Sequence, residues 1–226
     1  MMNITLDYLP NRPDIKLYQD HSMICINTDT MVLGEFLEVY RFDTVLDIGT
    51  NNGSLLLYAN RFNPRKLIGL DINREALELA KKNLELNNIS NYELVCGDAN
   101  TYIGEKVDVI VCNPPYFKVT DDSKKQAKNM VLAKHEDSLP LDSLIHTISN
   151  NLKDNGKLFF VYQSSRLQEM IDTFSKYHLN IKIMRYVYNV NKDNSNIVLI
   201  KAVKGGKLGM EVKKPIIIKD MKIINE

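Results

Sequence analysis

The stretch Val107-Asp108-Val109-Ile110-Val111-Cys112-Asn113-Pro114-Pro115-Tyr116 contains an apolar run that ends at two prolines. The run Val107–Cys112 is typical of a buried parallel strand. Two consecutive prolines cannot continue a hydrogen-bonded ladder, so the strand is predicted to end at Cys112. Asn113 then lies at the carboxyl end of a central strand, where open α/β sheets bind their ligands.

The residues Asn113–Tyr116 suit a flat base that carries an amino group. The side-chain carbonyl of Asn113 and the main-chain carbonyl of Pro114, held extended because Pro115 follows it, can both accept hydrogen bonds from one –NH2 group. The ring of Tyr116 can stack on the base. The alternative is a loop that only ends a strand, with Asn113 as a turn former and Tyr116 on the surface.

Strands and helices alternate on both sides of this stretch. Further strands are predicted at Thr44–Ile48, Lys66–Asp71, Tyr92–Cys96, Lys157–Tyr162, Ile181–Val190 and Asn196–Val203. Helices are predicted at Ser54–Arg61, Asn73–Asn87, Leu139–Leu152 and Arg166–Tyr177. The pattern predicts an α/β fold whose doubly wound, mostly parallel, seven-stranded sheet ends in an antiparallel hairpin.

The chain is predicted to be one domain, with a core at 44–203 between a lead-in at 1–43 and a tail at 204–226. Ile4–Leu9 alternates as a strand does, the prolines of Pro10–Pro13 break it, and Met23–Ile26 is a second candidate strand. Thr28-Asp29-Thr30 resembles a helix N-cap, and that helix is expected to close at 41–43.

Composition describes an ordinary globular protein. The 226 residues carry a net charge of +1, with 44% hydrophobic and 25% charged residues, so any nucleic-acid binding must rest on local patches. The three cysteines form no CxxC pair, which predicts no metal site and fits a reducing cytoplasm. Cys96 and Cys112 are expected to be buried thiols. No apolar run approaches the roughly 18 residues needed to span a membrane, and no signal-peptide pattern is present.

A second motif, Asp47-Ile48-Gly49-Thr50-Asn51-Asn52-Gly53, has the spacing D-x-G-x-x-x-G at a strand-to-helix turn. Glycines at 49 and 53 allow close approach of a ligand to the backbone, and Asn51 tolerates left-handed geometry. Asp71 follows at about the distance, ~20 residues, of an acid that binds a ribose hydroxyl, with Ile72 beside it. Asp98 and Ala99 follow the next strand, where an acid and a backbone group can contact an adenine.

Three interpretations of this loop compete. A dinucleotide would place its pyrophosphate on the helix N-terminus, and a purely structural turn would need no ligand. S-adenosylmethionine carries an ammonium and a sulfonium but no phosphate. The acid Asp47, two residues before Gly49, suits such a cation better than a pyrophosphate. The loop therefore favours S-adenosylmethionine.

With both motifs in this order, residues 25–203 resemble the Rossmann-like class I S-adenosylmethionine-dependent methyltransferases of the N-P-P-Y group. More narrowly, they are similar to the tRNA adenine-N6 methyltransferases that modify the base beside the anticodon of a valine tRNA. That narrower resemblance rests on Asn27–Gly34, Asn113–Phe117, Leu199–Gly206 and Pro215–Ile218. It implies that Thr28 and Asp29 lie beside the cofactor. Asn51-Asn52 departs from the usual glycine-rich centre of the loop.

The implied reaction methylates an exocyclic amine, with Asn113 also close to the cofactor and Tyr116 and Phe117 stacking on the target base. The segment after Phe117 can follow a phosphate backbone because its lysines outnumber its acids, Asp121 and Asp122. Its lysines are Lys118, Lys124, Lys125, Lys128 and Lys134. Seven lysines in 201–226 form a second basic stretch. Each stretch can equally be a solvated surface. The expected partner is tRNA, with no membrane, metal or obligatory protein partner.

Rival functions remain. Enzymes of the N-P-P-Y group also methylate a glutamine amide of release factors, but those usually carry a long helical domain before the cofactor motif, and only 46 residues precede Asp47 here. DNA adenine methyltransferases generally need an additional target-recognition region. A module that binds S-adenosylmethionine or RNA without turnover is the non-enzymatic alternative, and intact Asp47, Asp71 and Asn113 argue against it.

Overall fold

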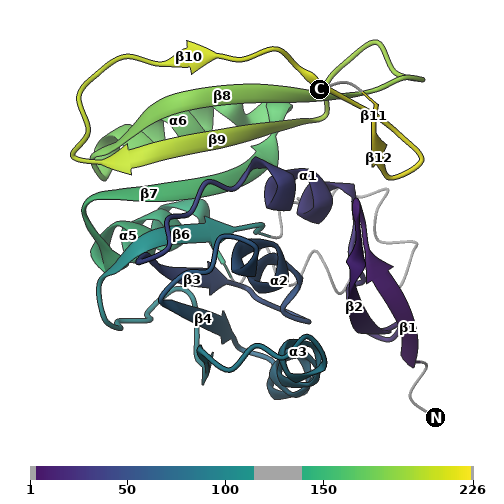
Figure 1. Cartoon of the computed structure of the whole chain (residues 1–226). Helices are drawn as coiled ribbons and strands as arrows, with labels where there is room; N and C mark the ends of the chain where they lie inside the picture. The colour runs from purple at the N-terminus through teal and green to yellow at the C-terminus, as the bar shows by residue number, and fades with distance from the viewer. Residues whose placement is uncertain (1–3, 115–138, 225–226) are drawn as a thin grey trace.

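The structure, a computed structural model of the whole chain, describes residues 4–114 and 139–224. Within these residues a ten-stranded sheet runs in the order β12-β11-β8-β9-β7-β6-β3-β4-β5, and β10 pairs with β8 (Figure 1). The seven predicted strands are β3 (Thr44–Ile48), β4 (Lys66–Asp71), β5 (Tyr92–Cys96), β6 (Val107–Cys112), β7 (Leu152–Gln163), β8 (Leu179–Asn189) and β9 (Ile197–Lys204). All seven are confirmed.

The sheet is parallel from β5 to β7, and β9 then lies antiparallel between β7 and β8. This is the predicted doubly wound order with an antiparallel C-terminal hairpin. β7 begins before the predicted start at Lys157 and contains a bulge, where the register with β6 shifts and Asn155 takes a φ of 63°.

Helices cover both faces of the sheet (Figure 1). Alternation along the strands decides the face: Val45, Leu67 and Val109 point to one side and their neighbours Leu46 and Ile68 to the other. The first face packs on α1 (Thr28–Phe36), α2 (Ser54–Asn60) and α3 (Arg74–Leu86). The second packs on α5 (Leu141–Asn151) and α6 (Leu167–Lys176), which a 3-10 turn at Ser164–Arg166 precedes.

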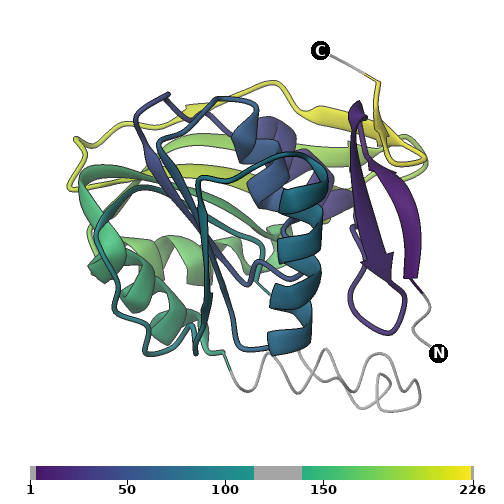
Figure 2. The ribbon, with the colours of Figure 1, turned by 60° about the horizontal axis from the view of Figure 1, so that its bottom comes forward.

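The lead-in differs from the prediction. β1 (Ile4–Leu9) pairs with β2 (Arg12–Asp20) as a separate antiparallel hairpin, which lies beside α3 in Figure 2. Pro13 does not break β2 because it lies where the register shifts, and there its missing N–H is not needed. The strand predicted at Met23–Ile26 is wrong: the N–H of Ile26 donates to the side chain of Gln19 instead of to a neighbouring strand.

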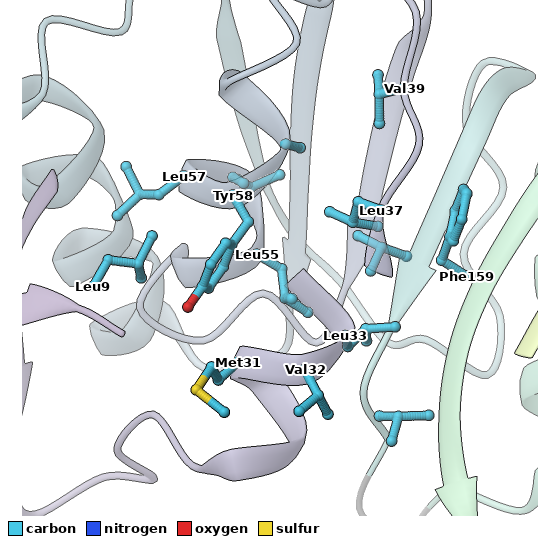
Figure 3. Close-up of a cluster of buried hydrophobic side chains, with 14 of the residues drawn as sticks. Leu9, Met31, Val32, Leu33, Leu37, Val39, Leu55, Leu57, Tyr58 and Phe159 are labelled. Atoms are coloured by element: carbon cyan, nitrogen blue, oxygen red, sulfur yellow. The ribbon is translucent and has the colours of Figure 1, made fainter. Parts of the chain in front are cut away.

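The first helix also differs at both ends. Its N-cap is Asn27, whose Oδ1 accepts from the N–H of Thr30 at 2.9 Å, so Thr28 is already helical. The helix ends at Phe36, well before 41–43, with Leu37 extended as the C-cap. Close packing fixes α1 on α2: a Cβ on Gly34 would lie 2.3 Å from Cδ2 of buried Tyr58. Figure 3 shows the Tyr58 ring among Leu9, Met31 and Leu55.

The tail forms three short strands. They are β10 (Glu211–Val212), β11 (Ile216–Lys219) and β12 (Lys222–Ile223). β11 runs parallel to β8, so its carboxyl end lies at the same edge of the sheet as the carboxyl ends of β3, β4 and β6. The turn after β11 reaches α1, where the hydroxyl of Thr28 donates to Sδ of Met221 at 3.2 Å.

Candidate active site

Strand register brings the predicted motifs to one edge of the sheet. Ile48 pairs with Cys112 on one side and with Leu70 on the other. The next residues on these three parallel strands are Gly49, Asn113 and Asp71. The Gly49–Gly53 loop, the end of β4 and the start of the Asn113 segment are therefore immediate neighbours.

Backbone hydrogen bonds fix the β3–α2 loop. The N–H groups of Gly49 and Thr50 donate to the carbonyl of Leu70 at 2.8 and 3.0 Å. Gly49 has a φ of 77°, and a Cβ built on it would meet nothing within 4 Å, so the backbone here faces open space. Asn51 takes a left-handed φ of 49°, as predicted from its tolerance of that region. Gly53 is left-handed too and packs against Ala80.

Asp47 is a fully buried carboxyl group with one unpaired oxygen. Its Oδ2 accepts from the hydroxyl of Thr50 at 2.7 Å, whereas Oδ1 has no hydrogen-bond partner among the described residues. Burial raises the pKa of Asp47 to about 7, and the negative charge of Asp71 adds to the rise. A cation at the open face of the loop would relieve this desolvation, so the site fits a ligand with a positive charge.

Asp71, the last residue of β4, is hydrogen-bonded to the same loop. Its Oδ2 accepts from the N–H of Asn51 at 2.8 Å and its Oδ1 from the N–H of Asn73 at 2.9 Å. Each carboxylate oxygen keeps a second lone pair that can accept from a hydroxyl group. Ile72 beside it is 64% exposed, so it offers an apolar surface at this edge.

Asp98 and Ala99 follow β5, the strand next to β4. The exposed Asp98 accepts at Oδ1 from the backbone N–H and the side chain of Asn100, at 2.8 and 3.0 Å. Ala99 is half-buried and packs on the core beneath the turn. These bonds hold Asp98 at the outer part of the edge that Asp71 and Ile72 form.

The α1 N-terminus closes the other side of this edge. Asp29 is half-buried there, and desolvation raises its pKa to about 6. The amide Nδ2 of Asn113 donates to Oγ1 of Thr30 at 3.1 Å, which joins α1 directly to the end of β6. Pro114 is buried next to it. This bond places the first turn of α1, which contains Thr28 and Asp29, beside Asn113, and their contact with the cofactor stays a prediction.

Several predicted residues lie outside the described residues, so their roles stay predictions. They are Pro115, Tyr116, Phe117, Lys118, Lys124, Lys125, Lys128 and Lys134.

Sequence reasoning missed three polar side chains of the site. Asn27, Thr30 and Thr50 make the hydrogen bonds described above. The signals for the first two were the resembling stretch Asn27–Gly34 and, for Thr30, the N-cap pattern at 28–30. The expectation for Cys96 was wrong: it is exposed, because β5 is an edge strand, whereas Cys112 is buried as expected. No cluster of metal-ligating side chains occurs in residues 4–114 and 139–224. No helix of that part is long and apolar enough to cross a membrane.

Comparisons with known proteins agree with this geometry. The family model "Methyltransferase small domain" matches residues 21–189. A tRNA1(Val) (adenine(37)-N6)-methyltransferase of Shewanella halifaxensis is 26% identical over 199 residues, covering 83% of this chain and 80% of that protein. A protein of the same name from Bacteroides thetaiotaomicron is 31% identical over 167 residues, covering 72% of this chain and 70% of that protein.

Solved structures share the fold. The tRNA m1G37 methyltransferase of M. jannaschii superposes with a TM-score of 0.65 at 17% identity, over 91% of this chain and 56% of that one. The ribosomal protein L11 methylase of Lactobacillus delbrueckii gives a TM-score of 0.57 at 20% identity, over 78% of this chain and 77% of that one.

The fold and the matching family model define a Rossmann-like class I methyltransferase that uses S-adenosylmethionine. Within that class, the chain belongs to the methyltransferase small domain family. The residues present fit this cofactor: Asp47 offers an unpaired buried oxygen to a cation, Gly49 offers open backbone, and Asp71 offers lone pairs to a ribose.

Proposed function

We propose that this chain methylates the exocyclic N6 amine of an adenine in tRNA, namely the adenine beside the anticodon of a valine tRNA. The observation that carries the proposal is the position of Asn113, directly beside Gly49 in the sheet register. The names of the relatives support the choice of acceptor. A tRNA acceptor would place the activity in the cytoplasm.

The acceptor amine sets the chemical problem. The lone pair of adenine N6 is delocalised into the ring, so the amine is a poor nucleophile. Asn113 Oδ1 and the main-chain carbonyl of Pro114 would each accept a hydrogen bond from one N6–H group, which turns the lone pair toward the methyl donor. S-adenosylmethionine supplies the electrophilic methyl group when it is bound. Positioning and electrostatics then provide the acceleration, and the product proton can leave to water without a dedicated base.

Recognition of the RNA completes the proposal. Tyr116 and Phe117 would stack on a base turned out of a loop, as single-stranded RNA bases commonly stack on aromatic side chains. Lysines after Phe117 and in the tail would contact phosphates. Lys219 and Lys222 flank the turn that touches α1, which supports an RNA path along this edge.

A methyl-transfer assay tests the proposal. Purified chain and labelled S-adenosylmethionine would be mixed separately with tRNA that lacks the modification and with a release factor. We expect N6-methyladenosine in the tRNA and no label in the protein. Label in a glutamine of the release factor would overturn the RNA acceptor. Cofactor binding without transfer to either acceptor would favour a binding module.

A further inference from the structure

The capping interaction of α1 fixes the orientation of one amide. The backbone N–H of Thr30 lies 2.9 Å from a side-chain atom of Asn27. A backbone N–H can only donate, so the atom facing it must be the carbonyl oxygen Oδ1 and not the amide nitrogen. The usual ambiguity between the two ends of an Asn side chain is thereby removed for Asn27.

That orientation determines the direction of the next hydrogen bond. The hydroxyl Oγ1 of Thr30 lies 3.1 Å from the same Oδ1 of Asn27. A carbonyl oxygen only accepts, so the single hydroxyl proton of Thr30 points to Asn27. The lone pairs of Oγ1 are then what Thr30 offers to any further neighbour.

The further neighbour is Asn113, which lies 83 positions away in the sequence and 3.1 Å away in space. Because Oγ1 of Thr30 has used its proton, it can only accept, and Asn113 must turn its Nδ2 toward it. The Oδ1 of Asn113 then occupies the opposite branch of the amide. A rotation of this amide by half a turn would break the bond to Thr30.

We propose that Thr30, oriented by Asn27, is a positioning residue that holds the Asn113 amide with Oδ1 turned to the acceptor amine. The inference rests on the proposed function, in which this oxygen accepts a hydrogen bond from the N6 amine of adenine. With the amide reversed, Nδ2 would face the amine, two donors would meet, and the lone pair of N6 would not be aligned.

Burial restricts the middle residue of the three, because Thr30 is buried, whereas Asn27 is exposed and Asn113 is half-buried. Thr30 is only 9% exposed, and its neighbours Met31 and Val32 are fully buried on α1. The contact between Gly34 and Tyr58 holds the helix against α2. Water therefore has little access to replace the hydroxyl of Thr30, and a loss of that group is felt at Asn113.

Two matched substitutions test the role of the hydroxyl. Thr30→Val keeps the shape and removes the hydroxyl, whereas Thr30→Ser keeps the hydroxyl. We expect kcat for tRNA methylation to fall about tenfold in Thr30→Val, as for the loss of one orienting hydrogen bond. The KM for tRNA and the Kd for S-adenosylmethionine should stay within about threefold, and Thr30→Ser should resemble the wild type. Asn27→Asp, which retains acceptor oxygens, should also retain kcat.

A second readout does not need turnover. In protein labelled with 15N at asparagine, the side-chain NH2 signal of Asn113 is assigned by its loss in Asn113→Ala. We expect this signal to shift in Thr30→Val and to stay in place in Thr30→Ser. An unchanged signal in Thr30→Val would overturn the positioning role even if the chain methylates nothing in tRNA. A changed signal with normal kcat would overturn the functional consequence. Equal losses of kcat and cofactor affinity in both variants would show a structural role instead.

Discussion

The loop at Gly49–Gly53 and the junction between Thr30 and Asn113 adjoin in space but are built in opposite ways. The loop is made by one short segment, whose backbone N–H groups bond to the end of the neighbouring strand. The junction is made by side chains from α1 and β6 that lie 83 positions apart. We propose that the first holds the cofactor through backbone shape and a buried charge, and that the second orients a side chain for the transfer step. We therefore expect that substitutions can separate cofactor binding from turnover.

The largest expected effect comes from the junction. Asn113→Ala removes the proposed acceptor of the hydrogen bond from the N6 amine. We expect kcat to fall about 1,000-fold, in the range seen when a group that orients the reacting centre is lost. The affinity for S-adenosylmethionine should change by no more than about threefold, because the loop bonds of Gly49 and Thr50 remain. Isothermal titration and single-turnover kinetics separate the two. Unchanged turnover would contradict the role of Asn113.

A substitution at Gly34 should disturb the packing of α1, the helix that carries Thr30. Gly34→Ala places a methyl group 2.3 Å from the ring of Tyr58, so α1 must move. We expect the free energy of unfolding to fall by about 2–3 kcal/mol, measured by urea denaturation.

The double variant with Tyr58→Leu gives the matched test for Gly34→Ala. Removing the ring relieves the clash, so the two free-energy changes should not add. Additive losses would show that the Tyr58 ring is not what limits the size of residue 34.

Asp47 tests the other region through pH. Burial raises its pKa from 3.8 to about 7, so between these values the folded chain binds a proton that the unfolded chain does not. The stability of the cofactor-free protein should therefore fall as pH rises from about 4 to 7. Asp47→Asn should be more stable than the wild type by up to about 4 kcal/mol at pH 8 and by little at pH 4.

The affinity for the cofactor should rise with pH, whereas the stability falls. A cation prefers the ionised carboxyl group, so the affinity of the wild type for S-adenosylmethionine should rise from pH 6 to 8. Asp29, whose pKa is raised to about 6, adds to the lower part of that rise. In Asp47→Asn the affinity should be about tenfold weaker at pH 8 and depend less on pH. If both proteins bound S-adenosylmethionine equally tightly at pH 8, Asp47 would not contribute to cofactor binding.

Two glycines give the smallest and most selective test. Both Gly49 and Gly53 are left-handed, but a Cβ on Gly49 meets open space, whereas one on Gly53 lies 3.2 Å from Ala80. Each alanine variant should lose about 1 kcal/mol of stability from backbone strain, and Gly53→Ala somewhat more from crowding. Only Gly49→Ala places a methyl group on the open face, so it should weaken cofactor binding more. The reverse order of affinities would contradict the position of the ligand.

The difference between the consecutive loop and the long-range junction also decides which features could be predicted from the sequence. The loop could be predicted because its residues are consecutive, and Asn51 carries its left-handed conformation in its residue type. The strands could be predicted because burial on both faces produces apolar runs such as Val107–Cys112. Thr30 could not be assigned a partner, because its bond to Asn113 depends on how α1 crosses the end of β6. The tail strands were missed because β10–β12 are too short to show a period.

The most direct test of the proposed tRNA methylation is to locate the methyl group. Unmodified valine tRNA would be incubated with the chain and S-adenosylmethionine, digested with a specific nuclease, and its fragments weighed by mass spectrometry. We expect one added methyl group in the fragment with the adenine beside the anticodon, released as N6-methyladenosine, and none with Asn113→Ala. A methyl group on another nucleoside, or the same product with Asn113→Ala, would contradict it.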